Sequence, residues 1–150
     1  MTKTRYLGSA WSGFGAREGG GRWNSVGVSM VYASETASLT MLETLIHLQS
    51  ASVLDFFTLM SIDVPDRLIE WIDIKQLPDD WAAPEAPAVL RLFGDAWIQS
   101  GGSVALRVPS ALSPVESNYL LNPEHPEFSA IVRQAVNIPF LFDARFSRQA

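Results

Sequence analysis

The chain has 150 residues, of which 47% are hydrophobic and 18% are charged, a balance typical of a globular domain and not of a disordered segment. Its net charge of −5, with 11 basic residues scattered along the chain, argues against general nucleic-acid binding, which needs a clustered basic surface. The absence of cysteine excludes disulfides and thiolate metal sites, and no apolar run approaches the roughly 18 residues of a membrane helix.

The length predicts one domain over residues 1–150. The N-terminal sequence MTKTRYLGSAW lacks the apolar core of a signal peptide. Together with the lack of cysteine, this favours a cytoplasmic protein.

Glycine dominates the first part of the chain. Seven glycines fall between residues 8 and 27, which predicts an irregular, close-packed loop region. The β-branched and aromatic content of Val28–Ala33 predicts a short strand. Ser34 is a suitable N-cap, and a helix is predicted from there to about Gln49 because its leucines recur at helical spacing.

The middle of the chain reads as two strands, a connection and a helix. The strands Phe56–Val64 and Leu68–Ile74 are predicted to be joined through Pro65-Asp66. Residues 75–88 hold three prolines and several acids, which indicates a surface connection within the domain. A second helix is predicted over Ala88–Ser100, where two glycines end it.

The last third is predicted to hold a strand over Val104–Val108, a turn-rich stretch over Leu120–Pro126 and a short helix over Phe128–Gln134. A final strand is expected over Ile138–Phe142, with Phe146 as a candidate extension. Strands outnumber helices and their connections are irregular, so the predicted class is α+β.

Arg22 follows three glycines in the segment GGGRWN. Glycine lets the backbone approach a ligand closely, and a guanidinium can hold a phosphate with two hydrogen bonds. The alternative is a surface arginine at the end of a loop, which the residues alone favour because glycine-arginine is a common pair. The segment is also neither a Walker loop nor a GxGxxG fingerprint.

Tyr32 stands at the end of the first predicted strand. Its ring could stack on a flat ligand, and Trp23 could do the same from the loop. The alternative is a core or cross-strand aromatic, the usual fate of such residues.

Glu43 carries a stronger functional signal than Arg22 or Tyr32. On a helical wheel it lies about 40° from Leu39 and about 60° from Ile46, so the carboxylate is set into the edge of an apolar face. A partly buried acid needs a partner or a purpose. The alternatives are a salt bridge to an arginine and a carboxylate that stabilises developing positive charge at a sugar carbon.

Other polar residues carry weaker signals. The two histidines, His47 and His125, are too few for a zinc site, and no GxSxG elbow supports a serine hydrolase that uses Ser110 and His125. Ser110 follows a strand, where its hydroxyl could bond a ligand amide or phosphate or could cap a turn. Asn118 lies in a segment dense in small polar groups, and its role stays open.

Taken together, several segments resemble the RES domain, a family named for an arginine, a glutamate and a serine. The resemblance covers nearly the whole chain in the same order, and the first and last segments together are quite specific. The segments are GGRWN, the strand ending in MVY, the helix LTMLETLIHL, the VPSA turn and NYLLNPEHPEF.

The resemblance implies an ADP-ribosyltransferase-like fold, with a central split, twisted β-sheet flanked by helices. It implies a toxin of a bacterial toxin–antitoxin pair that cleaves the nicotinamide–ribose bond of NAD without a metal, passing ADP-ribose to water, phosphate or a protein side chain. The implied partner is an Xre-type antitoxin with a helix-turn-helix part, with no direct contact of this chain to nucleic acid or membrane.

By the same resemblance, Arg22, Tyr32 and Glu43 carry over as the catalytic set. Ser110 matches the family serine, with Ser113 as the alternative, and Arg5 is the candidate for an arginine that family members carry near the N-terminus. The expected NAD-binding residues are Arg5, Arg22, Trp23, Asn24, Tyr32, Ser110 and Asn118.

In the expected reaction, Glu43 stabilises the ribosyl cation, Arg22 holds the diphosphate or ribose, and Tyr32 stacks on nicotinamide. The rival hypothesis is a catalytically silent module that acts only by binding its antitoxin. Release of nicotinamide from NAD discriminates the two.

Overall fold

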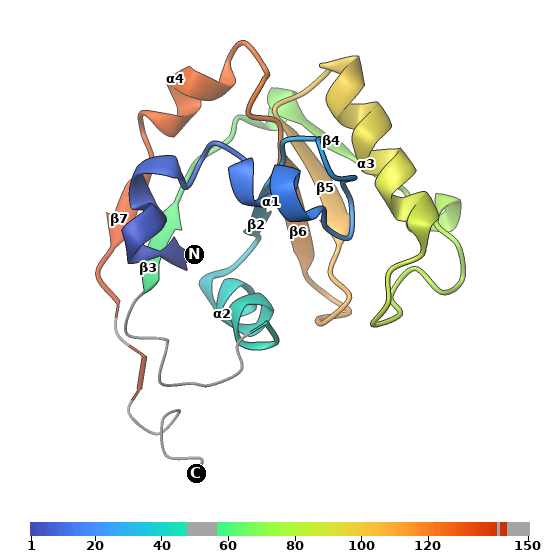
Figure 1. Cartoon of the computed structure of the whole chain (residues 1–150), viewed down its shortest axis with the longest axis horizontal. Helices are drawn as coiled ribbons and strands as arrows, with labels where there is room; N and C mark the ends of the chain where they lie inside the picture. Colours follow the sequence, from blue (N-terminus) through green and yellow to red (C-terminus); the bar gives the residue numbers. More distant parts are fainter. Residues whose placement is uncertain (48–56, 141, 144–150) are drawn as a thin grey trace.

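The computed structural model describes residues 1–47, 57–140 and 142–143, which form two β-sheets with helices around them (Figure 1). The strands are β1 (Thr2–Lys3), β2 (Val31–Ser34), β3 (Phe57–Ser61), β4 (Ile69–Trp71), β5 (Ala105–Pro109), β6 (Ser117–Leu121) and β7 (Val136–Ile138). The α-helices are α1 (Phe14–Gly19), α2 (Ala37–Leu45), α3 (Ala88–Ser100) and α4 (Phe128–Val132). The short 3-10 helices are η1 (Thr4–Ser9), η3 (Asp66–Leu68) and η4 (Ile74–Gln76).

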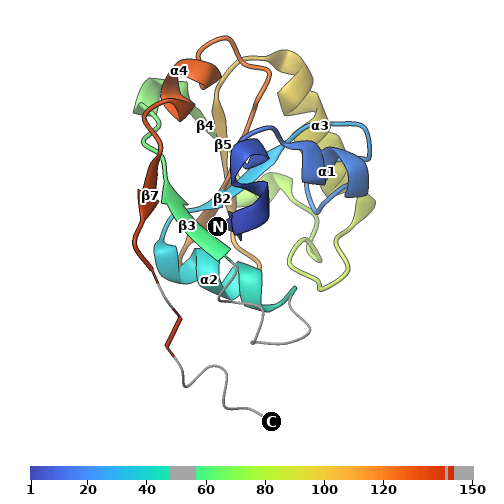
Figure 2. The ribbon, with the colours of Figure 1, turned by 60° about the vertical axis from the view of Figure 1, so that its left-hand side comes forward.

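The larger sheet has the strand order β2-β6-β5-β4, in which only the β4–β5 pair is parallel. The smaller sheet has the order β1-β3-β7 and is antiparallel throughout. Helix α2 lies at one end of both sheets, beneath the space between them in both ribbon views (Figures 1 and 2). Since β2 is an edge strand, the helix that follows it starts at the margin of the larger sheet.

Each face of the larger sheet carries its own apolar core, because successive residues of a strand point to opposite faces. Leu120 joins Trp23 and Trp97 in the core beneath α3. Its neighbour Leu121 joins Phe128 in the core beneath α4. Full burial of one such side chain stabilises the fold by about 1.5–3 kcal/mol, so the two cores fix α3 and α4 on opposite sides of the sheet.

The α+β class is confirmed, and the two sheets agree with the expected split sheet. Helix α3 has the predicted bounds, Ala88–Ser100, and ends at Gly101 with φ 60°, a left-handed cap that glycine adopts without strain. The strand predicted over Val104–Val108 and the helix predicted over Phe128–Gln134 are present as β5 and α4, with bounds that differ by one or two residues.

The start of α2 differs from the prediction. Ser34 is the last residue of β2, where it pairs with Asn118, and the N-cap is Thr36, whose hydroxyl accepts a hydrogen bond from Leu39 N at 3.1 Å. Pairing with β6 keeps the backbone extended for longer than the local sequence indicates. Residues 48 and 49 of the predicted helix lie outside the described residues.

Strand β6 was not predicted, because its short run NYLL is followed by turn-forming residues. The expected strands Phe56–Val64 and Leu68–Ile74 are not neighbours: β3 belongs to the smaller sheet, and β4 pairs with β5 in the larger one. Within residues 8–27, where an irregular loop was expected, the structure has the end of η1 and the helix α1. The last strand was expected over Ile138–Phe142, but β7 covers Val136–Ile138, because its pairing with β3 ends there. Phe56, Leu141 and Phe146, which were assigned to strands or to their extension, lie outside the described residues.

Over the described part of the chain, each helix is too short or too polar to span a lipid bilayer.

Candidate functional site

The segment GGRWN forms a rigid loop between α1 and β2. Asn24 is fully buried and holds the loop together, because its amide nitrogen donates to the carbonyl oxygens of Ala16, Ser25 and Val28. A side chain at Gly21 would collide with the loop's own contacts, since a Cβ there would lie 2.5 Å from the Tyr32 hydroxyl. The glycine is therefore required for close approach.

Helix α3 supports the same loop from the side. The Asp95 carboxylate accepts a hydrogen bond from Ser25 N at 3.0 Å, and Arg91 Nε donates to Gly21 O at 3.2 Å. Gly94 allows the contact, because a Cβ there would lie 1.8 Å from the carbonyl oxygen of Trp23. The loop is thus packed directly against the helix backbone.

Tyr32 has a fixed hydroxyl and an accessible ring. The hydroxyl accepts a hydrogen bond from Trp23 N at 3.0 Å and donates to Asn24 Oδ1 at 2.8 Å. Burial of the hydroxyl raises the pKa of Tyr32 to about 12, a shift that the Asp95 charge reinforces. The side chain as a whole is nevertheless 40% exposed, so the ring is available to a ligand while the phenol stays neutral.

Arg22 points to the connection between η4 and α3. Its guanidinium donates to the carbonyl oxygens of Trp81 at 2.8 Å and Ala83 at 2.9 Å. Among the described residues it has no carboxylate partner, so its positive charge is not neutralised by the protein part that the structure describes. Two of its five N–H groups are used in these bonds, which leaves donors for an anion.

The N-terminal end of α2 is tied to the turn between β5 and β6. Ser117 N donates to the Glu35 carboxylate at 2.9 Å, and the Thr36 hydroxyl donates to Glu116 at 2.5 Å. The bond from Thr36, with one from Ser113, lowers the pKa of Glu116 below its ordinary value.

Glu43 ties the C-terminal half of α2 to the same hairpin. Its Oε1 accepts a hydrogen bond from Asn118 Nδ2 at 2.6 Å and a longer one from the Ser110 hydroxyl at 3.4 Å. No described residue is bonded to Oε2, and no described arginine pairs with the carboxylate. The structure therefore brings together three of the predicted residues and does not show the salt-bridge alternative.

Ser110 is fixed as the donor in this cluster. Its hydroxyl accepts hydrogen bonds from Leu112 N and Ser113 N, each at 3.1 Å. A serine hydroxyl has two acceptor positions and one proton, so with both positions filled the proton is left for Glu43. The serine that contacts Glu43 is Ser110, while Ser113 contributes its backbone to the turn.

Asn118 carries an unusual feature. Its Oδ1 is buried without a hydrogen-bond partner, which is true of no other side-chain atom in the described part of the chain. The amide is held in place on β6, between Ser34 of β2 and Val108 of β5. A buried oxygen without a hydrogen bond lowers the stability of the fold. The Asn118 oxygen keeps this position because the nitrogen of the same amide donates a hydrogen bond to Glu43.

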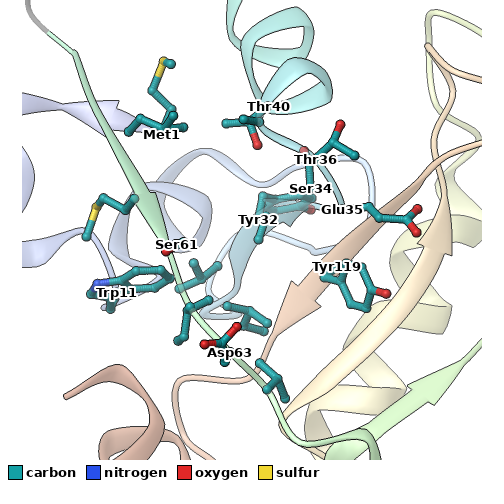
Figure 3. A pocket seen from close by; sticks show the side chains of 18 of the residues that line it. Met1, Trp11, Tyr32, Ser34, Glu35, Thr36, Thr40, Ser61, Asp63 and Tyr119 are labelled. Carbon is teal, nitrogen blue, oxygen red and sulfur yellow. The ribbon is translucent and has the colours of Figure 1, made fainter. Parts of the chain in front are cut away.

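A cavity of about 510 Å³ lies between the two sheets (Figure 3). We call it the inter-sheet cavity. Figure 3 shows Thr36 and Thr40 reaching it from α2, Tyr32 from β2 and Tyr119 from β6. Glu43 does not line this cavity; it follows the lining residue Thr40 by three residues, about 60° around the helix.

The inter-sheet cavity is acidic. Glu35, Asp63 and Asp66 line it, and among the described lining residues there is no arginine or lysine. Glu35 is paired with Arg107 at 3.8 Å, outside the cavity lining, and Met1 brings the α-amino group, so Asp63 and Asp66 supply the carboxylates without a described ion-pair partner. Tyrosine rings complete the wall. Such a surface favours a positively charged, flat group over a phosphate.

The other predicted residues lie elsewhere. Trp23 is packed in the core at 2% exposure, so its ring is not presented to a ligand. Arg5 lies in η1, not in a strand, with its guanidinium 4.8 Å from the centroid of the Tyr6 ring. Neither arginine candidate, Arg5 or Arg22, lines the inter-sheet cavity.

The geometry contradicts a hydrolase that uses Ser110 and His125. These residues lie beyond opposite ends of the β5–β6 hairpin, whose length of five residues corresponds to roughly 16 Å. His125 Nδ1 instead accepts a hydrogen bond from Glu127 N. Within residues 1–47, 57–140 and 142–143, no cluster of three or more histidine or acidic side chains could hold a metal ion.

Sequence reasoning missed Thr40, Tyr119 and Asp63 as lining residues. Thr40 shares a helix flank with Glu43 and was recognisable from the wheel. Tyr119 and Asp63 reach the cavity because of the order of the strands in the two sheets, which a single sequence does not reveal.

Comparison with known proteins adds a family to this geometry. The family model described as the RES domain matches residues 1–143. The chain is 41% identical over 141 residues to "Toxin Res" of Yersinia enterocolitica, and these residues cover 94% of this chain and 93% of the relative. It is 39% identical over 145 residues to "Toxin Res" of Photorhabdus laumondii, covering 97% and 93%.

A third relative, from a Sphingobium species, is named "Prs ADP-ribosylating toxin". It is 40% identical over 142 residues, which cover 93% of this chain and 88% of the relative. The chain belongs to the RES domain family.

Proposed function

We propose that this chain is the toxin of a bacterial toxin–antitoxin pair and that it cleaves the nicotinamide–ribose bond of NAD. The names of its relatives support the proposal: two are toxins of the same family, and a third is named as an ADP-ribosylating toxin. ADP-ribosylation takes its ADP-ribose from NAD, so NAD is the substrate that this likeness favours. In this proposal residues 1–150 form one RES domain that works in the cytoplasm.

The observation that carries the proposal is the orientation of Glu43. Asn118 and Ser110 both bind Oε1, and no described residue binds the other carboxylate oxygen. Breaking the bond to nicotinamide leaves positive charge on the ribose. A carboxylate fixed before the reaction stabilises that charge without having to reorganise.

The inter-sheet cavity suits the other end of the broken bond. The nicotinamide ring of NAD carries a positive charge, and the cavity offers the carboxylates of Asp63 and Asp66 and the exposed ring of Tyr32. Stacking on Tyr32 would combine ring contact with cation–π attraction. Because its hydroxyl stays protonated, Tyr32 acts through its ring and takes no part in proton transfer.

The proposed phosphate contacts fall to Arg22 and Arg5. Arg22 keeps unused donors and an unneutralised charge, and it belongs to the loop that holds the Tyr32 hydroxyl. Trp23 and Asn24 contribute by fixing the hydroxyl of Tyr32 and not by touching the dinucleotide.

The same ribosyl cation can be captured by water, by phosphate or by a protein side chain. Mass spectrometry of the products separates the three, because they yield ADP-ribose, its phosphorylated form or a protein of increased mass. The proposed partner is an Xre-type antitoxin with a helix-turn-helix part, and co-purification of the two chains tests it.

Nicotinamide release from NAD tests the activity itself. We expect the wild-type protein to release nicotinamide, and Glu43→Gln to lower the rate by about 100-fold or more, as loss of an oriented electrostatic group does. Glu70→Gln is the matched control, because Glu70 is an exposed acid on the edge strand β4. Full turnover by Glu43→Gln would contradict the assignment. No release by the wild type, with phosphate or a candidate target protein present, would favour the silent binding module.

A further inference from the structure

Helix α2, which carries Glu43, is only lightly anchored by apolar contacts. Among its nine described residues Leu39 is the one buried side chain, and Leu42 on the same helix is 47% exposed. Hydrogen bonds from the segment that joins β5 to β6 hold the helix as well. The position of the Glu43 carboxylate therefore depends on a few polar contacts.

These polar contacts hold α2 at two levels. The N-cap Thr36 donates a hydrogen bond to the Glu116 carboxylate at 2.5 Å, and Glu43 accepts one from Asn118 at 2.6 Å. Thr36 and Glu43 are seven residues apart in the sequence, which places them about 20° apart around the helix and roughly 10 Å apart along it. The helix is therefore attached at two points on one face.

Both attachment points come from one stretch of extended chain. Glu116 directly precedes β6, and Asn118 is the second residue of that strand. Alternate residues of a strand point to the same side, so these two side chains face α2 together. Ser117 lies between them, and its N–H donates to the Glu35 carboxylate at 2.9 Å while Glu35 N donates to Ser117 O at 3.0 Å. The start of α2 is thus tied to the same stretch that presents Asn118.

Glu116 also connects the start of α2 with the second donor to Glu43. Ser110 N donates to the backbone oxygen of Glu116 at 3.2 Å, and the Ser113 side chain donates to the Glu116 carboxylate. The Ser110 hydroxyl in turn donates to Glu43. The contacts close into a ring that runs from Thr36 through Glu116 and Ser110 to Glu43 and returns along the helix.

We propose that Glu116 is a positioning residue for NAD cleavage, an inference that rests on the proposed function of Glu43. Its carboxylate fixes the start of α2 against the strand, so that the helix cannot pivot about the single bond between Glu43 and Asn118. A carboxylate is also favoured beside the N-terminal end of a helix by the helix dipole. Glu116 does not line the inter-sheet cavity, so it acts through the helix and not on a ligand there.

Steady-state kinetics of nicotinamide release separate positioning from binding. Glu116→Ala should lower kcat by about 10–100-fold, since a displacement of about 1 Å at a reacting group has an effect of this size, and it should leave KM for NAD unchanged. Glu116→Gln should keep most of the turnover, because an amide oxygen still accepts the bond from Thr36. Glu127→Ala is the matched control: it removes two hydrogen bonds to Arg67 near α4, at the opposite end of the molecule from α2 (Figures 1 and 2), and should keep full turnover.

A double variant shows whether Glu116 acts through Glu43. Residues that work as a unit have non-additive effects on the rate. Glu116→Ala should therefore lower the residual rate of Glu43→Gln no further, although it lowers the rate of the wild type. The same loss in both backgrounds would overturn the proposal, as would full turnover by Glu116→Ala, an equal loss in Glu116→Gln or in Glu127→Ala, or an effect on KM alone.

Hydrogen exchange of the α2 amides gives a second measurement that does not depend on NAD. Residues 37–45 should exchange faster in Glu116→Ala than in the wild type, and Glu116→Gln should restore the slower exchange. Equal exchange in Glu116→Ala and the wild type would overturn the two-point attachment itself. Failure of the proposed function gives a different pattern: the wild type then releases no nicotinamide, while the faster exchange in Glu116→Ala still supports the attachment of α2 by Glu116.

Discussion

Asn118 and Ser110 hold the same oxygen of Glu43, yet we expect their removal to affect different properties of the protein. Asn118 makes the short bond of 2.6 Å, and Ser110 makes the long one of 3.4 Å. Ser110 also satisfies two backbone N–H groups, which Asn118 does not. We therefore expect Ser110→Ala to reduce stability and Asn118→Leu to reduce turnover.

The magnitudes follow from these contacts. Ser110 is 3% exposed, and its loss leaves two N–H groups without an acceptor at about 1–3 kcal/mol each when fully buried. Because the turn is near solvent, we expect about 2 kcal/mol in total. That corresponds to a decrease in Tm of about 4–8 °C for a chain of this size.

For Asn118→Leu the stability terms oppose each other. A hydrogen bond to a charged group contributes about 1.5–3 kcal/mol, but the variant also removes the buried oxygen that lacks a partner. The net change in the free energy of unfolding should stay within about 1 kcal/mol. If the lost bond is the one that fixes Glu43 for the reaction, turnover should fall by about 10–100-fold.

Two measurements separate these effects. Urea unfolding followed by the fluorescence of the five tryptophans gives stability, and nicotinamide release from NAD gives kcat. Asn118→Leu with full turnover would refute the positioning argument. So would a Ser110→Ala variant as stable as the wild type but inactive, because that serine would then act on the substrate itself.

Three further outcomes are expected. Gly94→Ala should lower the free energy of unfolding by about 1–3 kcal/mol, because its Cβ would overlap the Trp23 carbonyl. At an ordinary helix position the same change from glycine to alanine stabilises the protein, so a urea titration that shows increased stability would contradict the prediction. Tyr32→Phe should lower stability, because it removes the bonds of the hydroxyl to Trp23 and Asn24, but should leave the shape of the pH profile of NAD turnover unchanged from pH 6 to about pH 9, since a phenol with a pKa of about 12 does not titrate there. Tyr32→Ala, which also removes the ring, should lose turnover. The hydrogen bonds from Arg67 lower the pKa of Glu127 below its ordinary value of 4.5, so the wild type should be more stable than Glu127→Gln above that pH. Thermal melts at decreasing pH should show this difference in stability disappear as the carboxylate of the folded protein becomes protonated. A difference that persists at pH 2 would contradict the pairing.

Local signals predicted some elements well. Helix α3 begins after Pro87 and ends at a glycine, so both of its boundaries are marked in its own sequence. Strand β6 has no such marks. Its extended form depends on β2 and β5 at its two sides, and pairing partners that lie far away in the sequence cannot be read from a short segment.

In the candidate site, too, local sequence predicted the position of a residue but not its distant partners. The helical wheel predicted that Glu43 would stand at the edge of an apolar face. Its hydrogen-bond donors lie 67 and 75 residues further along the chain, and no spacing rule connects them to it. The resemblance implied that Arg22 binds a phosphate of the ligand. In the structure its guanidinium also donates hydrogen bonds to two carbonyl oxygens of the proline-rich connection between η4 and α3, a contact that the local sequence does not indicate.

The attachment of α2 to the β5–β6 hairpin also bears on when the protein could become active during its synthesis. Glu43 is translated early, but the serine and amide that orient it follow only at residues 110 and 118. The anchor of the helix start, between Glu35 and Ser117, spans 82 residues. A growing chain that ends before Asn118 would contain the carboxylate without the groups that aim it. If Glu43 acts as proposed, NAD cleavage would therefore begin only after residue 118 had left the ribosome and β6 had paired with β5.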